Sequence, residues 1–237
     1  MKPHCLLSLA SLSVAVFAGC AGSKIGSEIS PAAPHRGAVA EQSVNADVAL
    51  SRLREGNDRF RNGHLRHPDQ EISRLHEIAS AQHPFAVIVS CSDSRVPPEI
   101  VFDEGLGDLF VVREAGHVAD AATLGSIEYA VEHLHAHLVV VLGHENCGAV
   151  AAAADVITKN AKPEGHIVNL VDNIRPAIER SMGGSGSLVA RAVRANVDLV
   201  AENIRGSHPI LFEHLAHGDV KVVGAVYDLK TGAIEWR

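Results

Sequence analysis

Short apolar runs alternate with longer stretches of helical periodicity along most of the chain. The runs are rich in β-branched residues and predict three buried strands, at 85–89, 108–112 and 138–142. Near the C-terminus, 220–227 and 233–236 are separated by a turn at 230–232, which predicts an antiparallel hairpin. Strands that alternate with helices predict an α/β fold with a mainly parallel central β-sheet flanked by helices.

Helical patterns occupy the segments around these strands. The first helix is predicted from about Asn45, as an N-terminal arm with Val48, Leu53 and Phe60 on one face. The second covers 71–82, directly before the first strand. The remaining helices are predicted at 121–134, from Cys147 or Gly148 onward, and at 166–182, 187–205 and 209–217.

The first 20 residues have a pattern of their own. Lys2 precedes an apolar stretch at 6–18 that is too short for a permanent transmembrane helix and is typical of a secretory signal. Cys20 follows Ala-Gly, as in the signals of bacterial lipoproteins, although Phe17 stands where an aliphatic residue is usual. Signal peptidase cleavage after Ala18 therefore stays open as an alternative to lipidation of Cys20.

These patterns predict three regions: a signal peptide of lipoprotein type at 1–20, a flexible linker at 21–44 and one folded domain at 45–237. The linker is predicted from its Gly, Ser, Pro and Ala content and its lack of apolar periodicity. We therefore expect an exported protein of the periplasm or cell envelope. Its one membrane attachment would be a lipid on Cys20.

Composition and charge narrow the class of function. The chain has 237 residues, enough for one sizeable α/β domain, and only 4% of them are aromatic. The formal net charge is −7, and no dense run of Lys and Arg occurs, which argues against a nucleic-acid partner. Of the four cysteines, two belong to the predicted signal peptide, which leaves Cys91 and Cys147 in the domain.

Both remaining cysteines follow predicted strands. The first strand leads into Cys91-Ser-Asp93-Ser-Arg95, and the third leads into His144-Glu-Asn-Cys147-Gly148. Because open α/β sheets bind their ligands at the carboxyl ends of the strands, we expect these two motifs to meet at one edge of the sheet. In an oxidising compartment the two cysteines could form a disulfide, but the neighbouring His, Asp and Arg favour metal ligation.

The predicted metal site combines Cys91, His144 and Cys147, and two thiolates with an imidazole are a donor set that Zn²⁺ prefers. Three protein ligands leave a fourth tetrahedral position open, which is typical of a catalytic zinc site. Water in that position would be acidified by the metal to give hydroxide near neutral pH. Asp93 is placed to accept the hydroxide proton, with Arg95 keeping it ionised. Asp93 can instead become the fourth ligand, which would give the site a closed resting state.

In these motifs the sequence resembles the β-class carbonic anhydrases, from about Asp47 to the C-terminus. The resemblance implies that Cys91, His144 and Cys147 bind zinc and that Asp93 and Arg95 form the catalytic dyad. It also implies a substrate-binding pocket with the residues Gln82, Phe110, Tyr129 and Gly148. The segment Arg113-Glu-Ala-Gly-His117 departs from the pattern of the family, which usually has Arg-Asn-x-Ala/Gly-Asn.

The activity that the resemblance implies is the reversible hydration of CO₂ to bicarbonate and a proton through zinc-bound hydroxide. It further implies one Zn²⁺ per subunit and a homodimer or higher homo-oligomer. One alternative is a CS₂ or COS hydrolase on the same fold, which a restricted pocket entrance would favour. Another is a non-catalytic zinc-binding or redox-sensing lipoprotein. Four residues argue against this second alternative, because zinc storage needs none of them: Asp93, Arg95, Gln82 and Tyr129.

Overall fold

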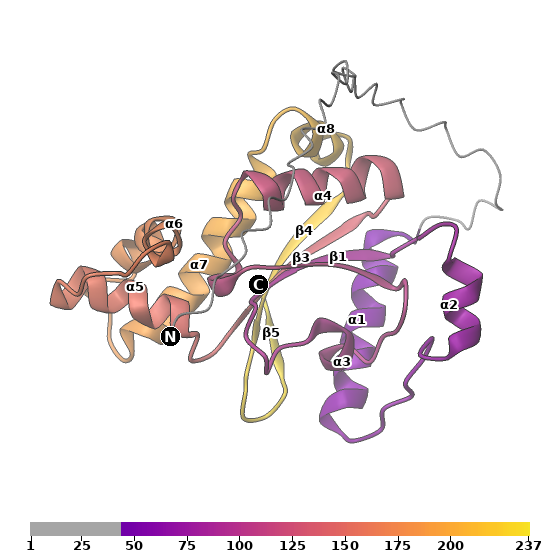
Figure 1. Ribbon diagram of the computed structural model, residues 1–237, viewed down its shortest axis with the longest axis horizontal. Coiled ribbons are helices and arrows are strands. Elements are labelled where there is room, and N and C mark those ends of the chain that lie inside the picture. The colour runs from indigo at the N-terminus through magenta and orange to yellow at the C-terminus, as the bar shows by residue number, and fades with distance from the viewer. Residues whose placement is uncertain (1–43) are drawn as a thin grey trace, which may run out of the picture. The chain divides into compact units, whose positions relative to one another are not determined.

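A five-stranded sheet lies at the centre of the computed structural model, which describes residues 44–237 (Figure 1). Its strands, in spatial order, are β2 (Leu109–Arg113), β1 (Ala86–Ser90), β3 (Leu138–His144), β4 (Lys221–Tyr227) and β5 (Ile234–Trp236). The first four are parallel, and β5 pairs with β4 in the antiparallel direction. The predicted α/β class, with a mainly parallel sheet and a C-terminal hairpin, is confirmed.

Helices connect and cover the strands. They are α1 (Ala46–Arg61), α2 (Ile72–Ile78), α3 (Pro98–Val101), the 3₁₀ helix η1 (Ala115–His117), α4 (Ala121–Leu134), α5 (Gly148–Lys159), α6 (Ile167–Arg180), α7 (Leu188–Arg205) and α8 (Ile210–His217). The bounds of α4 are those that the sequence predicts. The sequence predicts that the second helix ends at Gln82, but α2 ends four residues earlier, at Ile78. The segment that follows leads to Pro84, and a proline disfavours helical backbone at the residue before it.

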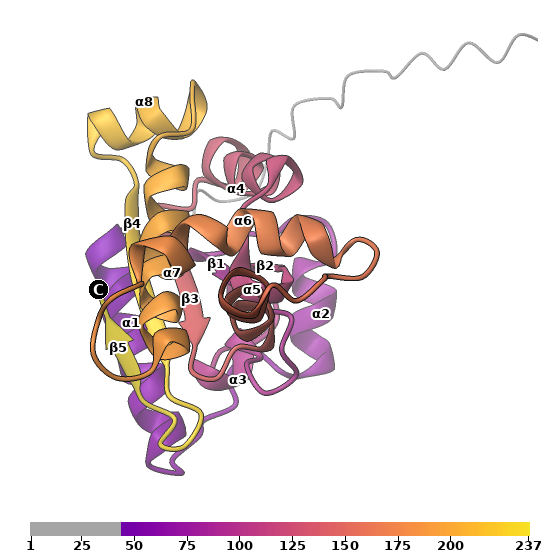
Figure 2. The same cartoon turned by 90° about the vertical axis from the view of Figure 1, so that its left-hand side faces the viewer.

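Alternate residues of the four parallel strands face opposite sides of the sheet and belong to two separate hydrophobic cores. On β1, Val87 and Val89 belong to the core that α4, α5, α6, α7 and α8 cover. Ala86 and Ile88 belong to the core that α1 and α3 cover. Figure 1 shows α7 and α1 on opposite sides of the sheet, and in Figure 2 α6 and α7 lie in front of the strands. This burial on both faces explains why the strands are continuous apolar runs in the sequence.

The buried face of α1 differs from the prediction. Val48 is 61% exposed, whereas Leu53 is fully buried. The two residues are five positions apart, which turns them by about 140° around a helix of 3.6 residues per turn, so they do not share a face. At Gly56 the helix meets the chain that follows α3, because a Cβ there would lie 1.8 Å from the carbonyl oxygen of Phe102.

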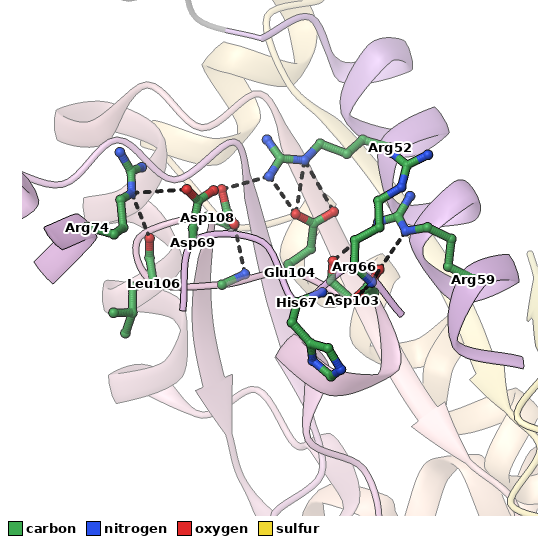
Figure 3. A network of polar contacts seen from close by, with 11 residues as sticks. Arg52, Arg59, Arg66, His67, Asp69, Arg74, Asp103, Glu104, Leu106 and Asp108 are labelled. Atoms are coloured by element: carbon green, nitrogen blue, oxygen red, sulfur yellow. Dashed lines mark hydrogen bonds and ion pairs between the residues drawn. The ribbon is translucent and has the colours of Figure 1, made fainter. Parts of the chain in front are cut away.

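A network of charged side chains joins α1 to the loop between α3 and β2 (Figure 3). Arg52 donates hydrogen bonds to both carboxylate oxygens of Glu104 and, at 2.7 Å, to Asp108. About two turns further along the same face of α1, Arg59 pairs with the buried carboxylate of Asp103. Because these contacts link residues that are more than 40 positions apart, they hold α1 against the rest of the domain.

Glu104 is expected to make folding stability depend on pH. Burial raises the pKa of Glu104 to about 7, against the opposing hydrogen bond from Arg52. An unfolded glutamate has a pKa of about 4.3, so the folded protein holds this proton more tightly. The stability that the protonated carboxyl contributes is therefore fully present below about pH 4.3 and is lost as the pH rises to about 7.

The variant Glu104→Gln stays neutral at every pH and is expected to remove this dependence. Between about pH 4.5 and 8, its free energy of unfolding should rise relative to that of the wild type by about 1–3 kcal/mol, as measured by urea titration. Glu55→Gln, at an exposed position of α1, is the matched control. The same pH dependence in wild type and Glu104→Gln would show that Glu104 does not titrate in this range.

Within residues 44–237, no helix has both the length and the hydrophobicity to cross a membrane. The predicted signal peptide and nearly all of the predicted linker lie outside the described residues.

Candidate metal centre and active site

The carboxyl ends of β1 and β3 bring the three predicted zinc ligands together. These strands are neighbours in the sheet, with Ser90 aligned with Leu142. Cys91 follows β1 directly, His144 ends β3, and Cys147 is the N-cap residue of α5. All three side chains are buried, and one potential ligand atom from each lies within 4.8 Å of the other two. The two sulfurs are 4.0 Å apart and are free thiols, so the disulfide alternative is wrong in this structure.

The orientation of His144 fits a metal ligand. Its Nδ1 atom lies 2.9 Å from the backbone oxygen of Glu145. A carbonyl oxygen can only accept a hydrogen bond, so Nδ1 carries the proton and Nε2 keeps its lone pair. Nε2 is buried and has no hydrogen-bond partner among residues 44–237. An unpaired, buried nitrogen lone pair beside two thiols is a donor that a Zn²⁺ ion would bind.

Hydrogen bonds shift the pKa values of the two thiols in opposite directions. The hydrogen bond with Cys147 lowers the pKa of Cys91, and the backbone N–H of Gly116, 3.3 Å away, supports the same thiolate. The same contact with Cys91 raises the pKa of Cys147. Zinc would bind both residues as thiolates, so its binding would displace the remaining proton, and zinc affinity should therefore fall at low pH.

Asp93 and Arg95 form a close ion pair beside the three ligands. The Arg95 guanidinium donates to both carboxylate oxygens of Asp93, at 2.9 and 2.7 Å, and the backbone N–H of Arg95 donates at 3.0 Å. The side-chain hydrogen bonds from Arg95 hold the pKa of Asp93 well below its usual range. The Oδ2 atom of Asp93 lies 3.8 Å from Nε2 of His144. An ionised carboxylate therefore borders the metal centre while Arg95 holds it.

Arg113, at the end of β2, is a site residue that the sequence analysis did not assign. Its guanidinium donates to the backbone oxygen of Cys91 at 2.9 Å and to that of Asp93 at 2.6 Å. The hydroxyl of Ser92 donates in return to the backbone oxygen of Arg113. Arg113 thus fixes the backbone that carries one predicted zinc ligand and the predicted catalytic carboxylate. The signal for it in the sequence was an arginine directly after the predicted strand at 108–112.

Comparisons with known proteins agree with this geometry. The sequence model of the carbonic anhydrase family matches residues 86–234. Carbonic anhydrase 2 of Mycobacterium tuberculosis is 41% identical over 190 residues, which cover 80% of this chain and 92% of that protein. The chain belongs to the carbonic anhydrase family. A carbonic anhydrase of Mycolicibacterium smegmatis is also 41% identical, over 81% of this chain and 94% of that protein.

The structural similarity places this carbonic anhydrase in the β class. The structure of a β-carbonic anhydrase from Coccomyxa, in complex with acetazolamide, matches with a TM-score of 0.63 and 27% sequence identity. The match covers 79% of this chain and 85% of that chain. The cofactor of this class is zinc, and the Cys91, His144 and Cys147 cluster supplies its donor set.

The predicted pocket residues of this carbonic anhydrase do not form one cluster within a single copy of the described chain. Gly148 is exposed and begins α5, next to the ligand Cys147. The rings of Phe110, on β2, and Tyr129, on α4, contact each other with centroids 6.3 Å apart. Phe110 precedes Arg113 by three residues, which places it about 10 Å along the strand from Arg113.

Gln82 and Tyr129 are not gathered at the metal centre of their own chain. Gln82 is exposed and precedes β1, whereas Cys91 follows the same strand, so the length of β1 separates them. Tyr129 is 48% exposed although most of its side chain is apolar. In a single copy of the chain, therefore, these two predicted pocket residues face solvent.

Proposed function

We propose that this protein is a zinc-dependent carbonic anhydrase that catalyses the reversible hydration of CO₂ to bicarbonate and a proton. The proposal is carried by one observation: a buried cluster of Cys91, His144 and Cys147 bordered by the Asp93–Arg95 ion pair, in a chain of this family. When bound, zinc supplies a Lewis acid that acidifies water at its one coordination position not taken by protein.

In this proposal Asp93 is the hydrogen-bond acceptor that orients the reacting water. Its hydrogen bonds with Arg95 keep the carboxylate ionised and fix the direction of its free lone pairs. Arg113 fixes the backbone of this loop, because it donates hydrogen bonds to the backbone oxygens of Cys91 and Asp93. The closed resting state, with Asp93 as a metal ligand, requires the carboxylate to leave Arg95, and it stays a prediction.

The substrate pocket is proposed to contain Gln82, Phe110, Tyr129 and Gly148 and to be completed in a homodimer or higher homo-oligomer. The exposure of Gln82 and Tyr129 supports this assembly, because both side chains are accessible to a partner and neither reaches the metal centre of its own chain. The N-terminal helix α1 is proposed as the arm that contacts the partner subunit, and its exposed Val48 supplies apolar surface for this contact.

We also propose that the protein is exported and lies in the periplasm or cell envelope. Residues 1–20 are the proposed signal peptide and 21–44 the linker, with a lipid on Cys20 as the anchor. The support is the apolar stretch at 6–18 and the Ala-Gly-Cys20 sequence that follows it. Cys20 lies outside the described residues.

The proposed activity is tested by stopped-flow CO₂ hydration on the purified protein without residues 1–20, with zinc quantified in the same sample. We expect the hydration rate to rise in proportion to zinc content. Stoichiometric zinc without hydration between about pH 6.5 and 9 would contradict the proposal. The same sample would then be assayed with CS₂ and COS. Turnover of either compound would identify a hydrolase on this fold, and its absence would leave a zinc-binding or redox-sensing role.

A further inference from the structure

The 3₁₀ helix η1 lies against the sulfur of Cys91. The backbone N–H of Gly116 donates to Cys91 Sγ at 3.3 Å. Gly116 has φ 74° and ψ 17°, a left-handed conformation that favours glycine. A Cβ at this position would also lie 2.7 Å from the side chain of Ile174. The direction of this N–H group therefore depends on the contacts that hold η1 in place.

Asn196, in the middle of α7, holds η1. Its side chain is fully buried, and its Nδ2 atom donates to the backbone oxygen of Gly116 at 2.9 Å. The same Nδ2 atom lies 3.0 Å from Nε2 of His117. Because the Gly116 oxygen can only accept, the amide orientation is fixed, and its second hydrogen faces the His117 ring. One amide group thus binds two consecutive residues of η1.

The ring of His117 packs against β3, the strand that ends at the predicted ligand His144. His117 is fully buried, and a Cβ on Gly143 would lie 3.0 Å from its Cε1 atom. Gly143 directly precedes His144 on β3. Asn196 is therefore connected through Gly116 to the sulfur of Cys91, and through His117 to the strand that presents His144.

We propose that Asn196 is a positioning residue of the metal centre, which aims the Gly116 N–H at the Cys91 thiolate and seats the His117 ring against β3. A hydrogen bond to a thiolate withdraws electron density from sulfur and makes a bound metal a stronger Lewis acid. This offsets part of the charge that two thiolates place on the metal. The inference rests on the metal site of the proposed function.

The test uses cobalt as a spectroscopic substitute for zinc. Wild type, Asn196→Leu and Asn196→Asp are loaded with Co²⁺, and the sulfur-to-cobalt charge-transfer bands are recorded. Zinc affinity is measured separately by competition with a chelator. Asp has nearly the shape of Asn, but a carboxyl group has at most one hydrogen to donate and cannot donate to both Gly116 and His117 as the amide does. It therefore tests the hydrogen bonds without a change of volume, and it decides the question if the leucine variant does not fold.

Asn57 provides the matched control. It is also buried, and its amide nitrogen likewise contacts two groups, here the backbone oxygens of Val101 at 3.2 Å and Gly232 at 2.9 Å. Asn57 belongs to α1, on the side of the sheet opposite α7. Asn57→Leu should lower folding stability as Asn196→Leu does, but it should leave the cobalt bands and the zinc affinity unchanged.

We expect both Asn196 variants to shift the charge-transfer bands to longer wavelength and to weaken zinc binding by about tenfold. Unchanged bands and unchanged affinity in a folded Asn196 variant would overturn the proposal and leave Asn196 a structural role. An equal shift in Asn57→Leu would overturn it as well. A wild type without thiolate-to-cobalt bands would instead overturn the Cys91 and Cys147 metal site, and with it the proposed function.

Discussion

The variant Cys147→Ser is expected to lose zinc and folding stability together. A serine hydroxyl does not ionise near neutral pH, so only Cys91 and His144 would remain as ligands. Binding of a metal to the folded state alone stabilises that state, by about 4 kcal/mol when free zinc is about 1,000 times its Kd. We expect the zinc content to fall below about a tenth of the wild-type value and CO₂ hydration to fall to background. Metal analysis, urea unfolding and stopped-flow assays of one preparation measure all three.

Two controls separate loss of the ligand from the cost of a buried hydroxyl. Val171→Thr places a hydroxyl in the same hydrophobic core, on α6, without removing a ligand. It should lower stability but retain zinc and activity. A chelator should lower the stability of the wild type towards that of Cys147→Ser and have little effect on the variant. Stoichiometric zinc in Cys147→Ser would refute the assignment of this ligand.

The strands were predictable because a strand that is buried on both faces is a continuous apolar run in the sequence. The runs 85–89 and 138–142 contain no charged residue, and the first residue of each lies within one position of the first residue of an observed strand. The metal cluster followed from the same pattern, because two motifs that directly follow parallel strands must lie at one edge of the sheet. The order of the strands was not predictable, since no local pattern states that β1 lies between β2 and β3.

The buried face of α1 was predicted in part. Leu53 and Phe60 are seven residues apart and belong to one core, but the same face was wrongly extended to Val48. Spacing alone should have separated Val48 from Leu53, because residues five apart do not face the same side of a helix. The charged network of Arg52 and Glu104 was missed for another reason: its partners are 52 residues apart, and only the fold brings them together.

Asn196 shows what a closer analysis of helical spacing could have found. It lies on α7 with Val193, Val197 and Val200, at the spacing i, i+3, i+4 and i+7 that marks one buried face. A polar residue in the middle of such a face needs a hydrogen-bond partner inside the protein. The pattern therefore indicates a buried amide, although it cannot name Gly116 and His117 as its partners.

Asp93→Asn is expected to retain zinc and the fold but to lower CO₂ hydration at least about 100-fold, the range in which a positioned acceptor of protons contributes. The amide has nearly the shape of the carboxylate, so packing is preserved. It carries no negative charge to pair with Arg95, and its NH₂ group donates hydrogen bonds where the carboxylate only accepts them. Stopped-flow assays with zinc quantified in each sample measure this effect.

Asp198→Asn is the matched control for Asp93→Asn. Asp198, on α7, also accepts hydrogen bonds from one guanidinium at both oxygens, in this case from Arg237 near the C-terminus. Neither residue contacts the metal cluster, so this variant should keep the wild-type rate. A near-normal rate in Asp93→Asn, with zinc bound, would remove the proposed role of Asp93. The Asp93–Arg95 pair would then be an ordinary ion pair that holds the loop after β1, and the acceptor for the reacting water would have to be sought elsewhere.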